Sequence, residues 1–271
     1  MPVSKGHLNP GAPNVSFDRF RLAPALSDLV RHVWVVRWEV PAGQVRAQRV
    51  LTYPAFNAVI NARRATLFGP QSTVQVQELT GTSWVIGVLF RPAAGRLLSA
   101  SEPAHRPGIG EELRGAPVEE LTRVMNGMQP ASEARLALVA ILNSWLSHYV
   151  SGLDERALLA NSVCQLAEDD ENILRSADLA ERVSVPRRSL ERLVYSQVGV
   201  TPKWLIDCRR LQQAASLLFA EPSASLADLA STLGYADYPH FSRSYKKVIG
   251  ETPRETRDWA RRQHSKVSNP T

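Results

Sequence analysis

Cysteine is almost absent from this sequence. Its 271 residues contain two, Cys164 and Cys208, and each falls on an apolar face of a predicted helix. They are far apart and form no CxxC pair, so the sequence offers no disulfide framework. We therefore expect both to be buried small hydrophobic side chains.

Long apolar runs are also missing. No stretch of about 18 apolar residues occurs, so the sequence predicts no membrane span and no membrane partner. The N-terminus has no long apolar segment after Lys5, so we expect no signal peptide. Together with the scarcity of cysteine, these features predict a protein of the reducing cytoplasm.

Motifs of catalytic and metal sites are missing as well. A metal-binding barrel needs clustered histidines with a carboxylate, but the strand-rich part has only His32, and His105 follows much later. Residues 68–73 lack the Lys-Ser/Thr pair of a phosphate loop, and no GxSxG nucleophile motif occurs. We therefore predict no catalytic residue, metal site or cofactor, with a barrel enzyme as the least favoured alternative.

Charge is unevenly distributed. Residues 1–170 contain 16 Lys and Arg against 15 Asp and Glu, whereas residues 171–271 contain 16 against 11. Most of the net charge of +6 therefore lies in the last hundred residues. A small positive charge is common in soluble proteins, but this asymmetry favours a polyanionic partner for the C-terminal part.

Short β-branched runs predict strands in the first half of the chain. Residues 1–16 are rich in Gly and Pro, and we expect them to be a flexible leader. The runs that follow are separated by Pro, Gly and Asn, a pattern typical of a compact antiparallel barrel or sandwich. They span residues 32–40, 45–53, 56–62, 65–69, 72–80 and 83–91.

Helical periodicity replaces the strand pattern after residue 92. Helices are predicted at 93–100, 118–128, 131–150 and 154–168, with a Pro/Gly-rich connection at 101–117. The helix at 131–150 has an apolar stripe, which suits a dimerisation helix and equally suits a helix packed on its own barrel. The stripe consists of Leu138, Ile141, Leu142, Trp145 and Tyr149.

The last hundred residues contain one pattern twice. In residues 226–254, Gly234 is placed to end a short helix and Asp237 to cap the next one. Residues 176–198 repeat this pattern, and a long helix at 201–220 joins the two copies. A short helix, a turn and a second helix with a basic side is the layout of a helix-turn-helix, which places its second helix in the DNA major groove. A helical bundle with a solvated charged face is the alternative for either copy alone.

Both copies resemble a known family. The first contains DLAERV, SLERL and GVTPKWL, and the second reads ADLASTLGYADYPHFSRSYKKVIGETPRE. In the second, an aromatic follows a glycine, then come Phe-x-Arg-x-aromatic-Lys and Gly-x-Thr-Pro. The last hundred residues thus resemble the DNA-binding region of the AraC/XylS family of bacterial transcription regulators. The resemblance implies two helix-turn-helix units joined by a connector helix.

The resemblance also implies roles for single residues. Arginine suits bidentate contact to guanine, glutamate can accept from cytosine, and lysines hold phosphates. Two departures affect these roles, because Pro186 stands where the family usually has a capping Ser and Pro239 replaces a polar reader. The base-reading positions implied are Arg188, Glu191, Arg192, Pro239, His240 and Arg243, with Arg187 also facing outward and Lys246 and Lys247 on phosphates.

Residues 17–105 resemble a second, less familiar domain found on some of these regulators. The family precedent implies a barrel that senses a small molecule, followed by helices that dimerise. An effector pocket in the barrel could be lined by Trp34, Trp38, Tyr53, Asn57 and Phe90, although core packing explains these aromatic residues equally well.

The expectation is therefore an α+β protein with four segments: a leader (1–16), a small β-barrel or sandwich sensing domain with dimerisation or connecting helices (17–168), an all-α DNA-binding domain with two helix-turn-helix units joined by a long helix (169–260), and a tail (261–271). Its predicted partners are double-stranded DNA, a small-molecule effector, RNA polymerase and a second copy of the chain. The alternative to effector sensing is a DNA-binding regulator that acts only through protein partners.

Overall fold

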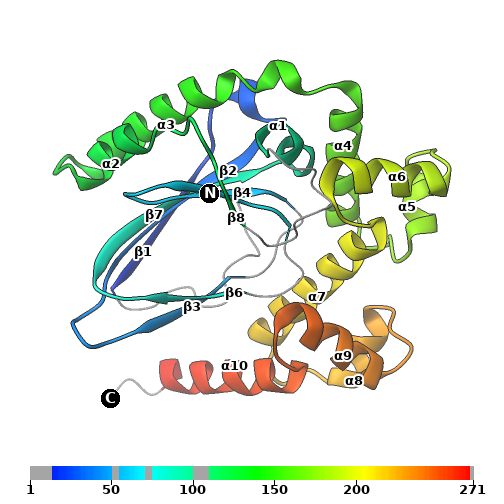
Figure 1. Cartoon of the computed structure of the whole chain (residues 1–271). Coiled ribbons are helices and arrows are strands. Elements are labelled where there is room, and N and C mark those ends of the chain that lie inside the picture. Colours follow the sequence, from blue (N-terminus) through cyan, green and yellow to red (C-terminus); the bar gives the residue numbers. More distant parts are fainter. Residues whose placement is uncertain (1–13, 51–54, 71–74, 100–109, 269–271) are drawn as a thin grey trace.

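The structure, a computed structural model, describes residues 14–50, 55–70, 75–99 and 110–268. Strands make up most of the first part, and the C-terminal part is entirely helical (Figure 1). The C-terminal helices run down one side of the sheets and then beneath them. The predicted α+β class, with a β-rich N-terminal part and an all-helical C-terminal part, is confirmed.

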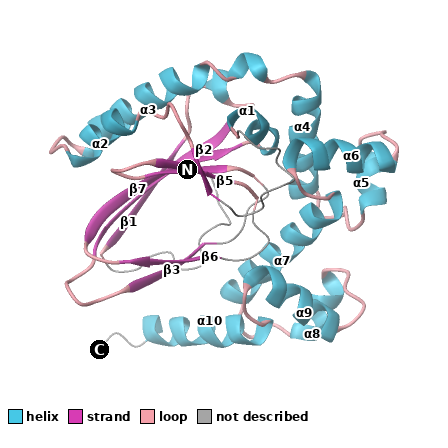
Figure 2. Ribbon diagram, viewed as in Figure 1, coloured by secondary structure: helices cyan, strands magenta, loops and turns pink. Residues whose placement is uncertain are grey.

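Six antiparallel strands form the main sheet, in the spatial order β1-β2-β7-β4-β5-β8. The strands β3 and β6 pair separately, and their two-stranded sheet lies across from the main one (Figure 2). The strands are β1 (Val15–Phe20), β2 (Val30–Glu39), β3 (Arg46–Val50), β4 (Asn57–Ile60), β5 (Ala65–Phe68), β6 (Gln75–Leu79), β7 (Thr82–Phe90) and β8 (Gly110–Glu112).

Helices cover one face of the main sheet and then form the C-terminal part. Among the described residues, no single helix is both long and apolar enough to cross a membrane; residues 131–152 and 155–169 reach that level only as a pair bent by 110°. The helices are α1 (Gly95–Leu98), α2 (Val118–Asn126), α3 (Ala131–Ser147), α4 (Glu155–Asp169), α5 (Ser176–Arg182), α6 (Arg187–Val198), α7 (Pro202–Ala220), α8 (Leu226–Thr232), α9 (Tyr238–Ile249) and α10 (Pro253–Ser268).

The core of the N-terminal part lies between the main sheet and the helices α2 and α3. Alternate residues of a strand point to opposite faces, so Ile86 and Val88 of β7 are fully buried on the helical side. From α3, residues four apart along one side, Leu138, Leu142 and Leu146, are buried against them. The apolar stripe of α3 therefore packs on the sheet of the same chain. Of the two roles that the sequence left open for this helix, this is packing on its own barrel rather than dimerisation.

Three segments differ from the expected boundaries. The leader was expected to reach residue 16, but β1 already begins at Val15. Within the expected connection at 101–117, Gly110–Glu112 forms β8 at the edge of the sheet beside β5. The expected tail is helical through Ser268, because α10 meets no Pro or Gly that would interrupt it.

The other face of the main sheet, opposite α2 and α3, has an aromatic surface. Trp34 of β2 pairs with Gly87 of β7, and a Cβ at Gly87 would lie 1.8 Å from Trp34 Cε2, so the indole ring lies directly on the glycine. The indole Nε1 donates to Asn57 Oδ1 of β4 at 3.3 Å. A glycine in the central strand thus lets a large ring lie flat against the sheet and reach a polar partner two strands away.

Polar contacts attach α4 to the end of the sheet. The guanidinium of Arg31 donates to both carboxylate oxygens of Glu168, at 2.6 and 2.7 Å. Arg91 Nη1 donates to Gln165 Oε1 at 2.6 Å. The buried Asn161 accepts from the amide of Ala93 at 2.9 Å, and its own amide donates to a carbonyl that precedes β2. Because these bonds satisfy buried polar groups on both sides, α4 is joined to the N-terminal part as one packed unit.

Replacing Gly87 by alanine should destabilise the N-terminal part. The new Cβ would displace the Trp34 indole, and we expect a loss of about 1–3 kcal/mol in the free energy of unfolding, as for other overpacked cores. Urea denaturation of both proteins measures this difference in the free energy of unfolding. In a Trp34→Leu background the same substitution should cost clearly less, and an equal cost in both backgrounds would show that the ring does not lie on Gly87.

Candidate nucleic-acid interface

The turn of each helix-turn-helix unit contains a residue with left-handed backbone geometry. In the second unit this residue is Gly234, with φ of 72°, and in the first it is Ser184, with φ of 53°. Glycine adopts this region freely, whereas a serine there is uncommon. The second helix of each unit also ends on a left-handed glycine, Gly199 after α6 and Gly250 after α9. The predicted role of Gly234 as the residue that ends α8 is confirmed.

The two turns are closed by equivalent hydrogen bonds. The amide of Val185 donates to the carbonyl of Ala180 at 3.0 Å, and the amide of Tyr235 donates to the carbonyl of Ala230 at 2.9 Å. Both donors and both acceptors are 50 residues apart in the chain. The turn is therefore the same structure built twice.

The second helices begin differently in the two units. The residues preceding them, Pro186 and Asp237, are 51 residues apart, so the second unit has one extra residue, Ala236, after its turn. The carboxylate of Asp237 accepts from the amide of His240 at 2.7 Å, which caps α9 as predicted. Pro186 has no side-chain acceptor, and α6 begins without such a cap.

Each second helix buries one face and leaves the other outward. In α6 three buried residues recur at four-residue spacing, and α9 buries larger side chains at the matching positions, two of them aromatic. At 3.0 Å, the hydroxyl of Tyr245 donates to Thr256 of α10, so this buried oxygen has a partner. The residues at these matching positions are Leu190, Val194 and Val198 in α6, and Phe241, Tyr245 and Ile249 in α9; Leu193 and Gln197 of α6 and Val248 of α9 are buried beside them.

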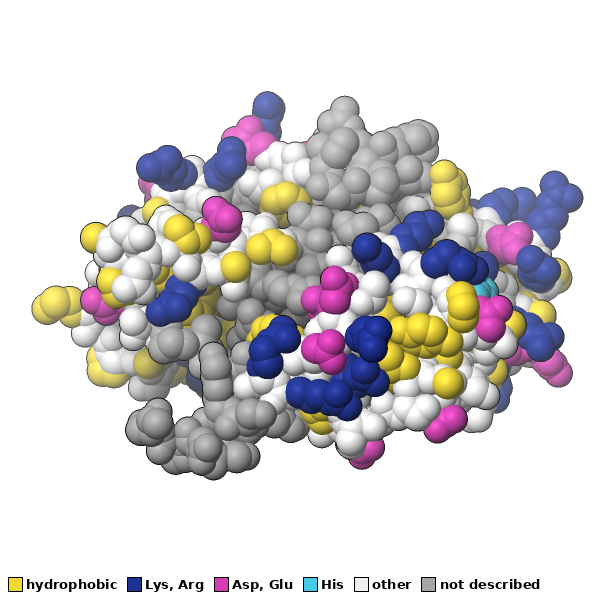
Figure 3. All heavy atoms as spheres, turned by 90° about the horizontal axis from the view of Figure 1, so that it is seen from below, with side chains coloured by type: hydrophobic (Ala, Val, Ile, Leu, Met, Phe, Trp, Pro, Cys, Tyr) yellow, Lys and Arg dark blue, Asp and Glu magenta, His cyan; other side chains and the backbone are white. Residues whose placement is uncertain are grey.

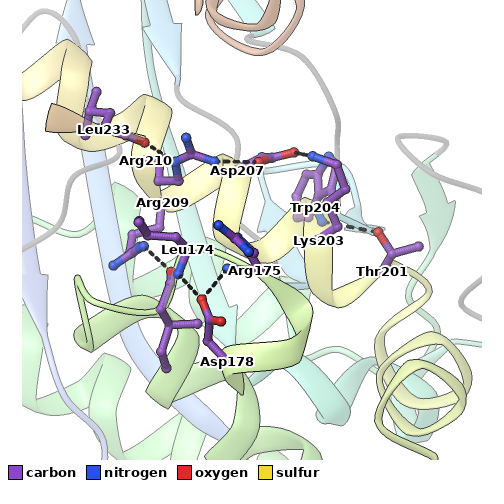
Figure 4. A network of polar contacts seen from close by, with 11 residues as sticks. Leu174, Arg175, Asp178, Thr201, Lys203, Trp204, Asp207, Arg209, Arg210 and Leu233 are labelled. Carbon is purple, nitrogen blue, oxygen red and sulfur yellow. Dashed lines mark hydrogen bonds and ion pairs between the residues drawn. The ribbon is translucent and has the colours of Figure 1, made fainter. Parts of the chain in front are cut away.

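The connector helix α7 contacts both units through two adjacent arginines (Figure 4). Arg209 donates to the carbonyls of Asp170 and Ile173, just before the first unit, at 2.5 and 2.7 Å. Arg210 Nε donates to the carbonyl of Leu233, at the end of α8, at 2.6 Å. Both arginine side chains are buried. Successive residues of one rigid helix thus fix the two units relative to each other.

Further contacts surround Arg210. Its guanidinium lies 4.2 Å from the centre of the Tyr235 ring, a cation–π contact, and 3.3 Å from Asp207. Burial raises the pKa of Tyr235 to about 12, so its phenol stays protonated. Close by, a Cβ at Gly234 would lie 3.3 Å from Leu174 Cδ1, so the turn of the second unit approaches the start of the first.

The outward faces contain the predicted DNA-binding residues. All of them are exposed except Glu191, which is half-buried and lies 2.9 Å from Arg187 in an i,i+4 ion pair. Such exposed pairs contribute only about 0.3–0.5 kcal/mol, so DNA can compete with the pair. Figure 3 shows Lys and Arg side chains gathered over the lower face of the molecule, where α8 to α10 lie. The exposed residues are Arg187, Arg188, Arg192, Pro239, His240, Arg243, Lys246 and Lys247.

Tyr195 is a further outward residue that the sequence patterns did not predict. Half of its surface is exposed, and it lies on α6 one turn beyond Arg192 and two beyond Arg188. It precedes Lys246 by 51 residues, the spacing of the second helices of the two units. The internal repeat was the signal that could have identified it: a tyrosine occupies in the first unit the position of a lysine in the second.

Comparison with known proteins agrees with this geometry. A family described as a helix-turn-helix domain matches residues 179–258, and a domain family of unknown function matches residues 18–106. A solved transcriptional regulator from Chromobacterium violaceum, described as containing an AraC-type DNA-binding domain, is 32% identical over 41% of this chain and 96% of its own, with a TM-score of 0.33. The chain belongs to the AraC/XylS family.

Curated AraC/XylS relatives match only part of this chain. The transcriptional regulator ArgR of Pseudomonas aeruginosa is 31% identical over 56% of this chain and 43% of its own length. The activator RhaS of Escherichia coli is 35% identical over 29% of this chain and 28% of its own. The chain thus spans less than half the length of these curated relatives. The structure of ToxT from Vibrio cholerae covers 91% of this chain at 13% identity, with a TM-score of 0.40, which is too low to carry a conclusion.

The predicted effector residues of this AraC/XylS chain lie on the aromatic face of the main sheet, with two exceptions. Trp34 and Asn57 are brought together there by their hydrogen bond. Trp38 lies on the same strand face, but its indole donates to the carbonyl of Thr80 at 3.1 Å. Phe90 is fully buried in the core on the helical side, which agrees with the alternative of core packing for this residue. Tyr53 lies outside the described residues.

His32 of β2, the strand of Trp34 and Trp38, is buried. Burial, reinforced by the positive charges of Arg19, Arg31 and Arg21, lowers its pKa to about 3, so the imidazole is neutral. Among the residues that the structure describes, no group of three or more His, Cys, Asp or Glu side chains could hold a metal ion. Cys164 and Cys208 are buried, as expected, and neither forms a disulfide; burial raises the pKa of Cys164 to about 12.

Substitution of Gly234 by alanine should destabilise the protein more than the same change at Gly115. Both glycines have φ above 70°, so both variants incur the left-handed penalty of about 1–2 kcal/mol. Only at Gly234 would the new Cβ meet neighbours, Leu174 and Arg210, at 3.3 and 3.4 Å, whereas nothing lies within 4 Å of a Cβ at Gly115. Urea unfolding followed by circular dichroism measures both. Equal losses would mean that the two units do not touch at this turn.

Proposed function

We propose that the chain regulates transcription by binding duplex DNA through both helix-turn-helix units at once. The observation that carries this proposal is the pair Arg209 and Arg210, which fixes two copies of one DNA-binding motif on a single helix. Two recognition helices held this way could enter major-groove segments about one turn, roughly 34 Å, apart. The protein would act by binding rather than by catalysis, in the cytoplasm.

Within the interface, we assign base reading to the first two turns of each recognition helix. In α6 these residues are Arg188, Glu191 and Arg192. In α9 they are Pro239, His240 and Arg243, and Pro239 lowers the number of polar contacts available there. Arginine can donate to guanine O6 and N7 together, so Arg192 and Arg243 carry most of the sequence preference.

Phosphate contacts fall to the later turns and to the helix start. Lys246 and Lys247 are exposed in the last turn of α9, and Arg187 is exposed at the start of α6. In the first unit, Tyr195 takes the place of Lys246. Its phenol can donate to a phosphate and pack on a sugar, but it brings no charge. The two units would therefore contribute unequally to the salt dependence of binding.

The N-terminal part is assigned to effector binding, on the aromatic face around Trp34, Trp38 and Asn57, with Tyr53 as a further candidate. That face is half-buried, lined by indole rings and supplied with an amide, which suits a small ligand with an apolar body. RNA polymerase and a second copy of the chain are proposed partners. Since the stripe of α3 is used within the chain, dimerisation would need another surface, such as the side of α3 where Leu136 is 70% exposed.

The rival proposal is a regulator without an effector, which acts through protein partners only. Calorimetry of the whole protein against a panel of metabolites separates the two. Binding that is lost in an Asn57→Ala variant supports the effector site. Binding that is unchanged in that variant contradicts this assignment, and no binding across the panel favours the rival.

The DNA proposal is tested by selecting bound duplexes from a random pool and then measuring variants on the selected site. Arg192→Ala and Arg243→Ala should each weaken specific binding by about 1–3 kcal/mol and relax the sequence preference. Arg114→Ala is the matched control, because this arginine is almost fully exposed in the N-terminal part. An unchanged site preference in both variants would refute the assigned reading roles.

Salt titrations of the same complexes separate Lys246 from Tyr195. Lys246→Ala should weaken binding to all duplexes and reduce the slope of log K against log salt by about 0.9, the value for one phosphate contact. Tyr195→Ala should lower the affinity and leave the slope unchanged. If Tyr195→Ala alters neither quantity, Tyr195 lies outside the interface.

A further inference from the structure

A hollow lies in the helical layer, on the side of the sheet opposite the aromatic face. It has a volume of about 360 Å³ and is formed where the start of α2 meets the C-terminal half of α3. This volume is near the lower end of the range for ligand pockets, so it suits a small molecule. The side chains that give it chemical character are Glu120, Ser144, Trp145, His148 and Tyr149.

The groups around this hollow are rich in electrons. Among the described residues that line it, Glu120 is the only carboxylate, and none is Lys or Arg. Within the described part of the chain, no ion pair involves Glu120, and its carboxylate is exposed. Its neighbour Glu119 also lies in the first turn of α2, so the favourable interaction with the helix dipole does not depend on Glu120 alone.

Two aromatic rings complete the set. Trp145 lies in the last turn of α3, and Tyr149 follows two residues after the helix ends, where the backbone still has helical angles, so the two residues are about one turn apart. Both are half-buried and pack against the sheet core, which fixes their positions. His148 Nδ1 lies 3.3 Å from the carbonyl of Trp145; if Nδ1 donates there, Nε2 is left as an acceptor. Indole and phenol faces attract cations, and a carboxylate beside them adds a full negative charge.

We propose that this hollow binds a small organic cation, an alkylammonium, between Glu120 and the rings of Trp145 and Tyr149. The carboxylate would supply charge attraction and the two rings would supply cation–π contact. A neutral molecule of the same size would gain only apolar contact. An anion would meet repulsion from Glu120, and no Lys or Arg among the described lining residues offsets it. The site is separate from the DNA interface and from the proposed effector face.

The test uses the full-length protein labelled with ¹⁵N, titrated with tetramethylammonium chloride and, separately, with tert-butanol. The two probes have the same number of non-hydrogen atoms, but only the first is charged. A sodium chloride titration removes the effect of ionic strength. The indole N–H signal of Trp145, identified by its absence in Trp145→Phe, should shift and saturate with tetramethylammonium. The affinity for tert-butanol should be lower by about tenfold or more.

Two glutamate variants decide the role of the charge. Glu120→Gln should weaken tetramethylammonium binding by about tenfold, whereas Glu119→Gln, one residue away and outside the hollow, should leave it unchanged. Equal affinity for the two probes would overturn the proposal, because the hollow would then be merely apolar. It would also be overturned by a Trp145 signal that does not respond, or by equal losses in the two glutamate variants.

Discussion

Two adjacent guanidinium groups on α7 determine how the C-terminal part is assembled. Arg209 donates to carbonyls of the segment that leads into α5, and Arg210 donates to the carbonyl that ends α8. Hydrogen bonds of charged groups contribute about 1.5–3 kcal/mol each, and an unpartnered buried charge costs several kcal/mol. Burial lowers the pKa of Arg209, while the carboxylates of Glu171 and Asp170 act in the opposite sense. Any rearrangement of one unit against the other would therefore break these hydrogen bonds and leave a buried guanidinium without its acceptor.

The same packing extends to the N-terminal part. The short helical turn Pro92–Ala94 that follows β7 contacts both α4 and α6, and Ala93 is buried in the same cluster as Leu190 and Val194 of the first recognition helix. The opposite face of the same sheet holds Trp34 and Asn57. A ligand that moves β7 would thus act on α6 through the turn Pro92–Ala94, with α4 held by Arg31 and Asn161. The first unit is thus in contact with the N-terminal part through residues 92–94.

Much of this architecture could be predicted because it depends on local chemistry. Gly234 and Asp237 predict the turn of the second unit, because few residue types other than glycine adopt left-handed backbone geometry and few side chains can cap a helix. Other features depend on distant contacts. β1 was missed because its sequence, VSFDRF, alternates poorly: Asp18 lies on the helical side, where it pairs with Arg135 of α3. The apolar stripe of α3 has the same periodicity whether it meets a sheet or a second copy.

In the candidate site, too, some features follow from local sequence and others from contacts between distant residues. The outward residues of α6 and α9 follow from helical periodicity and the family resemblance. The bonds of Arg209 and Arg210 do not, because their acceptors are backbone carbonyls, which every residue possesses. Nothing in the sequence distinguishes these arginines from those expected to contact DNA. Likewise, the hydrogen bond from Trp34 to Asn57 requires the strand order β2-β7-β4, which a sequence alone does not specify.

The most direct test of the account is the distance between the two units in solution. Spin labels on cysteines at the exposed positions Glu181 and Ser231, which are equivalent in the two units, can be read by double electron–electron resonance. The native cysteines are buried and should not react. We expect one narrow distance distribution, which Arg210→Met broadens and Lys203→Met, an exposed control on the same helix, leaves unchanged. A broad distribution in the unmodified sequence, or an equally narrow one in Arg210→Met, would contradict a rigid pair of units.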